Sequence, residues 1–186
     1  MRIIGGNLKG KKIFLPKDKK TRPLRDLVKE SIFNLIEHSN RFECNIKGSN
    51  ILDLFSGTGS FGLECISRNA KKVTFVENYR DALNVLKKNI INLKVKNNCE
   101  IFEEDCFNFF KSEKIFLKKF NLIFIDSPYQ EKKINLLIDE IKIKEILDKN
   151  GILIIHRHKK DKISLSDKIK ILDERNYGIS KIIVCF

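Results

Sequence analysis

The segment Asp53-Leu54-Phe55-Ser56-Gly57-Thr58-Gly59-Ser60-Phe61-Gly62 contains the spacing G-x-G-x-x-G. It begins inside an apolar run that predicts a strand over 51–55, and it continues into a segment with helical character over 60–68. Glycines at such a junction permit positive φ angles and allow a ligand to approach the backbone closely. A strand, a glycine-rich turn and a helix in this order are typical of nucleotide-binding α/β proteins.

On both sides of this segment, apolar strands alternate with amphipathic helices. The sequence predicts strands over 51–55, 73–77, 99–103, 122–126 and 151–155, and helices over 60–68, 81–93, 107–119 and 134–147. The run 122–126 is apolar enough to be buried on both faces of a sheet. With a closing hairpin of 169–172 and 179–186, the pattern predicts an α/β fold with a Rossmann-like, doubly wound, mostly parallel, seven-stranded sheet. Ligands of such sheets bind beyond the carboxyl ends of the strands.

The chain before residue 50 does not follow this alternation. Residues 3–6 and 12–15 predict a small hairpin around Gly10, and Thr21 and Pro23 predict the start of an amphipathic helix that ends near His38. A length of 186 residues accommodates one large core with a small appendage. We therefore expect a basic N-terminal extension over 1–49 and a larger domain over 50–186.

Positive charge is concentrated in this extension. The formal net charge of the chain is +13, and residues 1–30 contain ten Lys and Arg against three Asp and Glu. Such clustering is typical of polyanion binders, and nucleic acid is favoured over an acidic membrane because no amphipathic anchor with aromatic residues accompanies it. The alternative is a solvated surface that reflects coding bias, since the chain has 29 Lys and only 8 Arg. The candidate RNA-binding residues are Arg2, Lys9, Lys11, Lys12, Arg22 and Arg25.

The remaining composition restricts the class of protein further. No apolar run approaches the about 20 residues that span a bilayer, and the N-terminus lacks the long apolar segment of a signal peptide. Five cysteines without C-x-x-C spacing argue against a zinc site and against a disulfide framework. We expect a cytoplasmic monomer with no membrane partner and no metal.

Acidic residues at the predicted strand ends discriminate between cofactors. Glu77 lies where a carboxylate binds ribose hydroxyls, which fits a dinucleotide as well as S-adenosylmethionine. Asp53, four residues before Gly57, would repel a pyrophosphate but would attract the ammonium group of S-adenosylmethionine. Asp105 is placed to meet an adenine edge, or it only caps a helix. We expect S-adenosylmethionine to be bound by Asp53, Phe55, Ser56, Gly57, Gly59, Glu77, Asn78, Asp105, Cys106 and Asp126.

A second motif, Asp126-Ser127-Pro128-Tyr129, ends the apolar run 122–126. It resembles the D/N-P-P-Y/F motif of methyltransferases that modify exocyclic amines of nucleobases or glutamine amides. The resemblance implies that these four residues are catalytic: Asp126 and the Ser127 carbonyl accept hydrogen bonds from the target amine, Pro128 fixes the turn, and Tyr129 stacks on the base. Ser127 departs from the usual Pro, which removes one φ restraint and predicts an active but softer site.

Further segments resemble one family among these enzymes. Together with both motifs, they are similar from end to end to the RsmD-type bacterial 16S rRNA guanine-N2 methyltransferases. The resemblance implies a class I methyltransferase fold and transfer from S-adenosylmethionine to guanine N2, of the type that modifies guanine 966, in free 16S rRNA or in the 30S subunit. The segments are Arg2-Ile3-Ile4-Gly5-Gly6, Gly10-Lys11-Lys12, Thr21-Arg22-Pro23, Val28-Lys29-Glu30-Ser31-Ile32-Phe33-Asn34 and Leu63-Glu64.

Other functions share part of this pattern. A DNA adenine-N6 methyltransferase has the same second motif, but 186 residues leave little space for a domain that reads DNA sequence. A glutamine methyltransferase of release factors typically has Asn-Pro-Pro-Tyr and needs no basic arm. A non-catalytic RNA-binding assembly protein would tolerate Ser127 without consequence. His156 is a further departure from the RsmD-type family, because it stands in a strand-end position that often carries Glu there. An isolated histidine is more typical of a packing or surface residue than of a catalyst.

Overall fold

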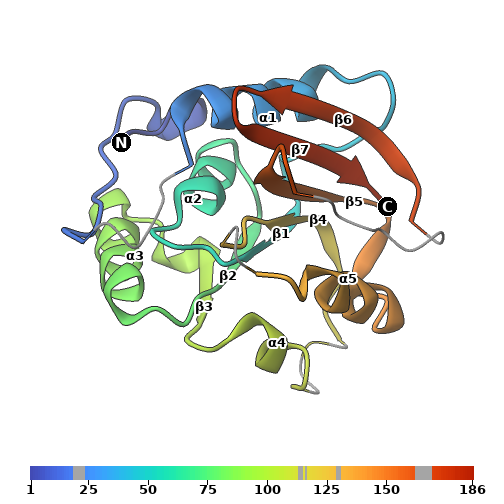
Figure 1. Cartoon of the computed structure of the whole chain (residues 1–186). Helices are drawn as coiled ribbons and strands as arrows, with labels where there is room; N and C mark the ends of the chain where they lie inside the picture. Colours follow the sequence, from blue (N-terminus) through green and yellow to red (C-terminus); the bar gives the residue numbers. More distant parts are fainter. Residues whose placement is uncertain (19–23, 113–114, 116, 129–130, 162–168) are drawn as a thin grey trace.

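A seven-stranded sheet forms the centre of the protein in the computed structural model, which describes residues 1–18, 24–112, 115, 117–128, 131–161 and 169–186 (Figure 1). The strand order is β3-β2-β1-β4-β5-β7-β6. The first five strands run parallel, and the β6–β7 hairpin adds antiparallel to β5. This arrangement confirms the predicted fold class. The strands are β1 (Asn50–Leu54), β2 (Lys72–Val76), β3 (Cys99–Phe102), β4 (Phe120–Ile125), β5 (Leu147–His158), β6 (Ile171–Tyr177) and β7 (Ser180–Cys185).

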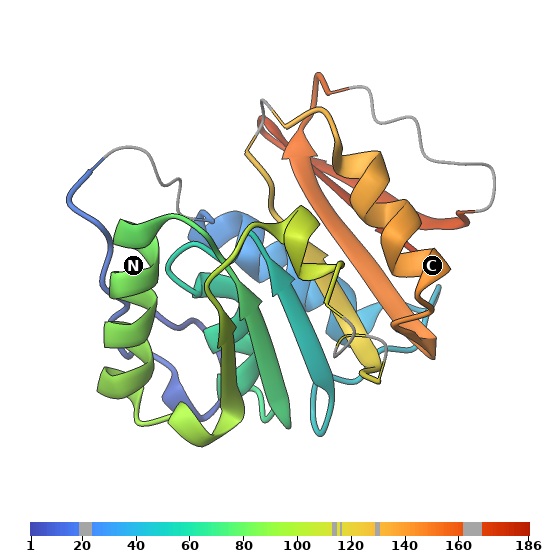
Figure 2. The same cartoon turned by 90° about the horizontal axis from the view of Figure 1, so that it is seen from below.

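Helices cover both faces of the sheet, as the view in Figure 2 shows. Alternation along the strands creates two separate apolar layers: Ile51 joins the cluster beneath α1, α2 and α3, whereas Leu52 joins the cluster beneath α4 and α5. None of the helices in the described segments combines the length and apolarity needed to cross a membrane. The helices are α1 (Asp26–His38), α2 (Ser60–Ser67), α3 (Arg80–Leu93), α4 (Cys106–Phe109) and α5 (Ile134–Ile143), with short 3-10 turns η1 (Gly6–Leu8) and η2 (Lys96–Asn98).

The N-terminal segment packs against the first of these layers. Ile3 and Ile13 are buried in the same cluster as α1 and α2. The predicted hairpin is present as a short antiparallel pairing: Arg2 and Lys12 form a bridge, and the amides of Ile3 and Ile13 donate to the carbonyls of Lys11 and Met1 at 2.9 and 3.0 Å. The amides of Ile4 and Gly5 donate to the Glu64 carboxylate on α2. The predicted helix start at Thr21 and Pro23 lies outside the described residues. The proposed boundary at residue 49 remains a prediction.

Other element boundaries also differ from the sequence prediction. The helix predicted over 107–119 is the four-residue α4, which is followed by turns that bury Phe110 and Ile115. Strand β5 is longer than the predicted 151–155 at both ends. Its first residue pairs with Phe120 of β4 across a register shift, and its last six residues, 153–158, pair with β7. The extension toward β7 brings the residues after 155 to the edge of the sheet where ligands are expected.

Candidate functional site

The predicted site residues gather at the carboxyl ends of four neighbouring strands. Asp53 lies on β1, Glu77 directly follows β2, Asp105 follows β3, and Asp126 directly follows β4. Since β3, β2, β1 and β4 are adjacent in the sheet, these carboxylates from distant parts of the sequence share one edge.

The glycine-rich loop joins β1 to α2, and its first two glycines have different surroundings. Gly57 has φ +56°, and a Cβ added there would meet no atom within 4 Å. Gly59 has φ +81°, and a Cβ there would lie 2.4 Å from Cδ1 of the buried Leu86 on α3. Gly59 therefore allows the loop to pack closely against α3, whereas the backbone of Gly57 is open to an approaching ligand.

Glu77 organises this loop through backbone amides. Its Oε2 accepts a hydrogen bond of 2.7 Å from the amide of Gly57, and its Oε1 accepts from the amides of Asn78 and Tyr79 at 3.0 and 2.8 Å. The residue is 9% exposed. Each carboxylate oxygen can accept more than one hydrogen bond, so the side chain keeps capacity for ribose hydroxyls. That contact remains a prediction.

Asp53 is buried and caps α2. Its Oδ2 accepts a hydrogen bond of 3.0 Å from the amide of Gly62, the third residue of that helix. Burial raises the pKa of Asp53 well above its usual value, and the nearby carboxylates of Asp126 and Glu77 raise it further. Three acidic groups that repel one another around an open loop favour a cationic ligand, because its charge would relieve the repulsion.

The remaining predicted cofactor residues line the neighbouring turns. Phe55 has a φ of +57°, and the amide of Ser56 donates to the carbonyl of Val76 at 3.1 Å, which ties the loop to β2. Asp105 caps α4 through the amide of Phe107 at 2.8 Å, and its other oxygen accepts from Asn78 Nδ2 at 3.3 Å. Cys106 is buried, and burial raises the pKa of its thiol.

The second motif is held by the end of β5. Asp126 Oδ1 lies 2.7 Å from His156 Nδ1. The Arg157 guanidinium donates to Ser127 Oγ at 2.6 Å, to the carbonyl of Pro128 at 2.8 Å and to the carbonyl of Glu131 at 3.0 Å. Where the sequence predicted a softer site at Ser127, hydrogen bonds from a buried arginine hold the loop. Tyr129 lies outside the described residues.

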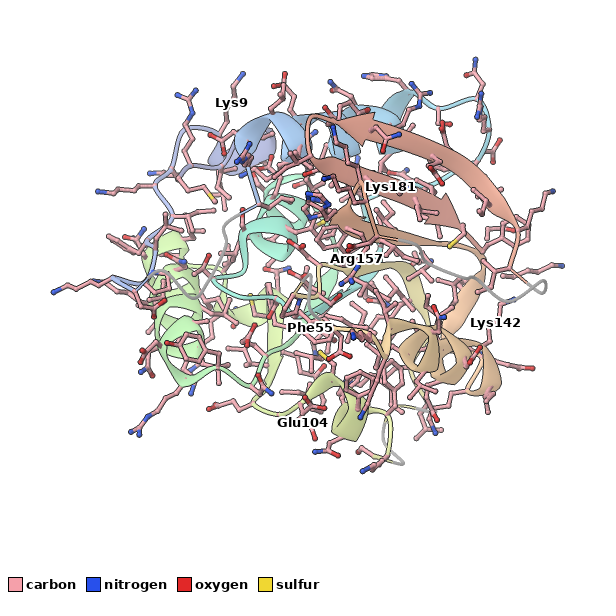
Figure 3. All side chains as sticks on the ribbon, viewed as in Figure 1. Lys9, Phe55, Glu104, Lys142, Arg157 and Lys181 are labelled. Carbon is pink, nitrogen blue, oxygen red and sulfur yellow. The ribbon has the colours of Figure 1, made fainter. Side chains whose placement is uncertain are left out.

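Sequence reasoning did not anticipate either contact from β5. Arg157 was not a candidate residue, and His156 was expected to pack or to lie on the surface. These contacts follow from strand register, which the structure shows: Ile125 pairs with Ile155 in parallel, so the next residue on each strand lies beside the other. Figure 3 shows Arg157 and Phe55 near the middle of the view, where the central strands end.

The candidate RNA-binding residues come from the first 25 residues of the chain. Figure 3 shows Lys9 at the periphery, away from Phe55 and Arg157. The neighbouring Lys29 is not available to a ligand: it is fully buried, its Nζ donates to the carbonyl of Arg2 at 2.8 Å, and burial lowers its pKa. Five candidates are exposed and the sixth, Arg22, lies outside the described residues; the exposed ones are Arg2, Lys9, Lys11, Lys12 and Arg25.

The described part of the chain contains no group of three or more His, Cys, Asp or Glu side chains that could hold a metal ion. The donor set at the sheet edge consists instead of carboxylates and backbone amides around an open glycine loop. This set fits an organic cation that also carries hydroxyl groups.

Comparison with known proteins identifies relatives along the whole chain. The model of a family described as conserved hypothetical protein 95 matches residues 1–185. Ribosomal RNA small subunit methyltransferase D of Haemophilus influenzae is 32% identical over 185 residues, which cover 96% of this chain and 90% of that protein. The protein of the same name in Escherichia coli is 33% identical over 143 residues, 75% of this chain and 67% of that protein.

Solved structures share the fold. A proposed methylase of Haemophilus influenzae superposes with a TM-score of 0.78 at 29% identity, over 99% of this chain and 96% of that one. The proposed methyltransferase SMU.776, solved in complex with SAH, has a TM-score of 0.66 at 18% identity, over 84% of this chain and 48% of that one. At that identity the second likeness concerns the fold alone.

Proposed function

This chain belongs to the family described as conserved hypothetical protein 95, with the small-subunit methyltransferases D among its relatives, and we propose that it transfers a methyl group from S-adenosylmethionine to the N2 of a guanine in 16S rRNA. The observation that carries the proposal is the convergence of Asp53, Glu77 and Asp126 at one edge of the sheet, around a glycine loop open to a ligand.

The first three strand ends form the cofactor site in this proposal. Glu77 binds the ribose hydroxyls, Asp53 attracts the ammonium group, and Asp105 lies at the adenine edge. The open face of Gly57 allows the ligand to approach the backbone. When bound, S-adenosylmethionine supplies a methyl group on a sulfonium, which departs as a thioether.

The loop after β4 receives the target base. Asp126 and the Ser127 carbonyl accept hydrogen bonds from the exocyclic amine, which localises the nitrogen lone pair and aligns it for in-line attack. Asp126 is also placed to accept the proton that this nitrogen loses. The N2 edge of a paired guanine is occupied, so the base must be unpaired or flipped, and Tyr129 provides a stacking surface.

Methyl transfer to RNA tests the proposal directly. Tritiated S-adenosylmethionine is incubated with undermethylated 30S subunits, with free 16S rRNA and with DNA, and the labelled nucleoside is identified by mass spectrometry. We expect N2-methylguanosine from an rRNA substrate. We also expect Asp126→Ala to lose about 10²- to 10⁴-fold in turnover while S-adenosylhomocysteine still binds in calorimetry. Transfer to DNA adenine, or none to any substrate, would contradict the proposal.

The exposed basic residues of the N-terminal segment hold rRNA phosphates in this proposal. A Lys9/Lys11/Lys12→Ala variant should bind rRNA more weakly, and the slope of log affinity against log salt should fall by about 0.7–0.9 for each lost phosphate contact. S-adenosylhomocysteine binding should not change, because these three lysines are exposed and are not among the predicted cofactor residues. An unchanged salt slope would mean that these lysines do not contact RNA and only form a solvated surface.

A further inference from the structure

His156 and Asp126 form a side-chain pair that the strand register builds. Ile125 of β4 pairs with Ile155 of β5 in parallel, so Asp126 and His156 follow on adjacent strands and face the same side of the sheet. Their Oδ1 and Nδ1 atoms are 2.7 Å apart. The His156 side chain is 9% exposed and that of Asp126 is 23% exposed, so the pair lies at the boundary between the core and the site.

A third residue fixes the orientation of the imidazole ring. Nε2 of His156 lies 2.9 Å from Oγ of Ser180, the first residue of β7, which is also buried. A neutral imidazole can donate to an ionised carboxylate only when its proton is on Nδ1. Nε2 is then an acceptor, and the serine hydroxyl donates to it. The carboxylate of Asp126, which can only accept, therefore sets the tautomer, and Ser180 holds the other side of the ring in either role.

We propose that His156 is a positioning residue for methyl transfer: its Nδ1–H holds Oδ1 of Asp126, so that Oδ2 remains available to the target amine. This inference rests on the proposed function. Asp126 is close enough to the buried carboxylate of Asp53 to interact with it electrostatically, and like charges repel. A fixed hydrogen-bond donor on the far side opposes rotation of the Asp126 carboxylate away from the substrate. During transfer the proton of His156 stays on Nδ1, and the proton lost by the amine goes to Oδ2 of Asp126.

Two substitutions separate positioning from packing. His156→Leu removes the donor, whereas His156→Asn retains an N–H near the position of Nδ1. We expect His156→Leu to lower kcat by about tenfold to a hundredfold, with KM for rRNA and the Kd for S-adenosylhomocysteine within about twofold of wild type. His156→Asn should recover kcat to within about threefold. The matched control is His158→Asn on the same strand, which should be neutral because the ring of His158 accepts from the amide of Lys160.

Two further measurements cover the case in which His156→Leu does not fold. Ser180→Ala should lower kcat by about threefold with KM unchanged, because the ring loses the hydrogen bond that fixes its orientation. In the ligand-free protein, 15N NMR of the ring should show the proton on Nδ1, and Asp126→Ala should shift the population toward Nε2–H.

The outcomes distinguish this inference from the proposed function. Wild-type protein that transfers no methyl group to rRNA would overturn the proposed function itself. If wild type is active, three results would overturn the role of His156 alone. These are a folded His156→Leu variant that keeps its kcat, a His156→Asn variant as impaired as His156→Leu, and a ring that carries its proton on Nε2.

Discussion

The two loops at the carboxyl edge of the sheet are stabilised in different ways. The glycine loop after β1 is held by carboxylates that accept from its own backbone, through Glu77 to Gly57 and Asp53 to Gly62. The loop after β4 is held by side chains of another strand, through His156 to Asp126 and Arg157 to Ser127. In the first loop the backbone geometry depends on which residues are glycine. In the second, it depends on partners about 30 residues away.

Removing Arg157 should cause the largest loss of stability and would test whether β5 holds the second loop. Arg157→Leu leaves Ser127 Oγ and the carbonyls of Pro128 and Glu131 without this donor. We expect the free energy of unfolding to fall by about 3 kcal/mol in urea titration. Turnover should fall as well, because Asp126 belongs to the same loop.

The control for this variant is Arg80→Leu on the exposed start of α3, where a change within about 0.5 kcal/mol is expected. If Arg157→Leu were as stable as this control, the hydrogen bonds from Arg157 would not hold the loop. The loop would then have to be stabilised by its own turn, as the glycine loop is.

Two alanine variants in the glycine loop should lose different properties: Gly59→Ala mainly stability, and Gly57→Ala mainly cofactor binding. Gly59→Ala places a methyl group against Leu86 at a positive φ, which should lower the free energy of unfolding by about 2–3 kcal/mol. Gly57→Ala points its methyl group into open space and should cost only about 1 kcal/mol, but it should weaken S-adenosylhomocysteine binding. Urea titration and calorimetry measure the two effects. Equal stability losses with unchanged binding for Gly57→Ala would mean that the open face of the loop does not meet the cofactor.

The difference between the two loops also explains which features could be predicted from the sequence. The alternation of strands and helices, the glycine loop and the acidic strand ends were all evident, because each depends on short spacing or on the hydrophobic pattern. The contacts of His156 and Arg157 depend on the register between β4 and β5, which the sequence does not specify. The predicted N-terminal hairpin is present as a short antiparallel pairing, but its attachment to α2 could not be predicted for a similar reason: Glu64, about 60 residues away, accepts from the amides of Ile4 and Gly5.

A further effect concerns Asp53, whose carboxylate accepts from the first turn of α2 although burial disfavours its charge. Its pKa is raised in the folded protein, so the native state holds a proton more tightly than the unfolded chain does. Ligand-free stability should therefore fall as pH rises from about 4, the ordinary Asp pKa, through the raised value in the fold. Asp53→Asn removes this dependence and can still accept from the amide of Gly62. At neutral pH the variant should be more stable than wild type by about 1–2 kcal/mol.

With S-adenosylmethionine bound, wild type should be more stable than Asp53→Asn, because the ammonium group proposed to bind Asp53 needs a negative charge there. Urea titrations of wild type and Asp53→Asn at several pH values, each with and without S-adenosylmethionine, measure both effects, and the difference between the two proteins isolates Asp53 from the other carboxylates. If Asp53→Asn were less stable at neutral pH without ligand, the charge itself would be needed for capping α2. The first loop would then depend on electrostatics in the fold, and not on hydrogen-bond geometry alone.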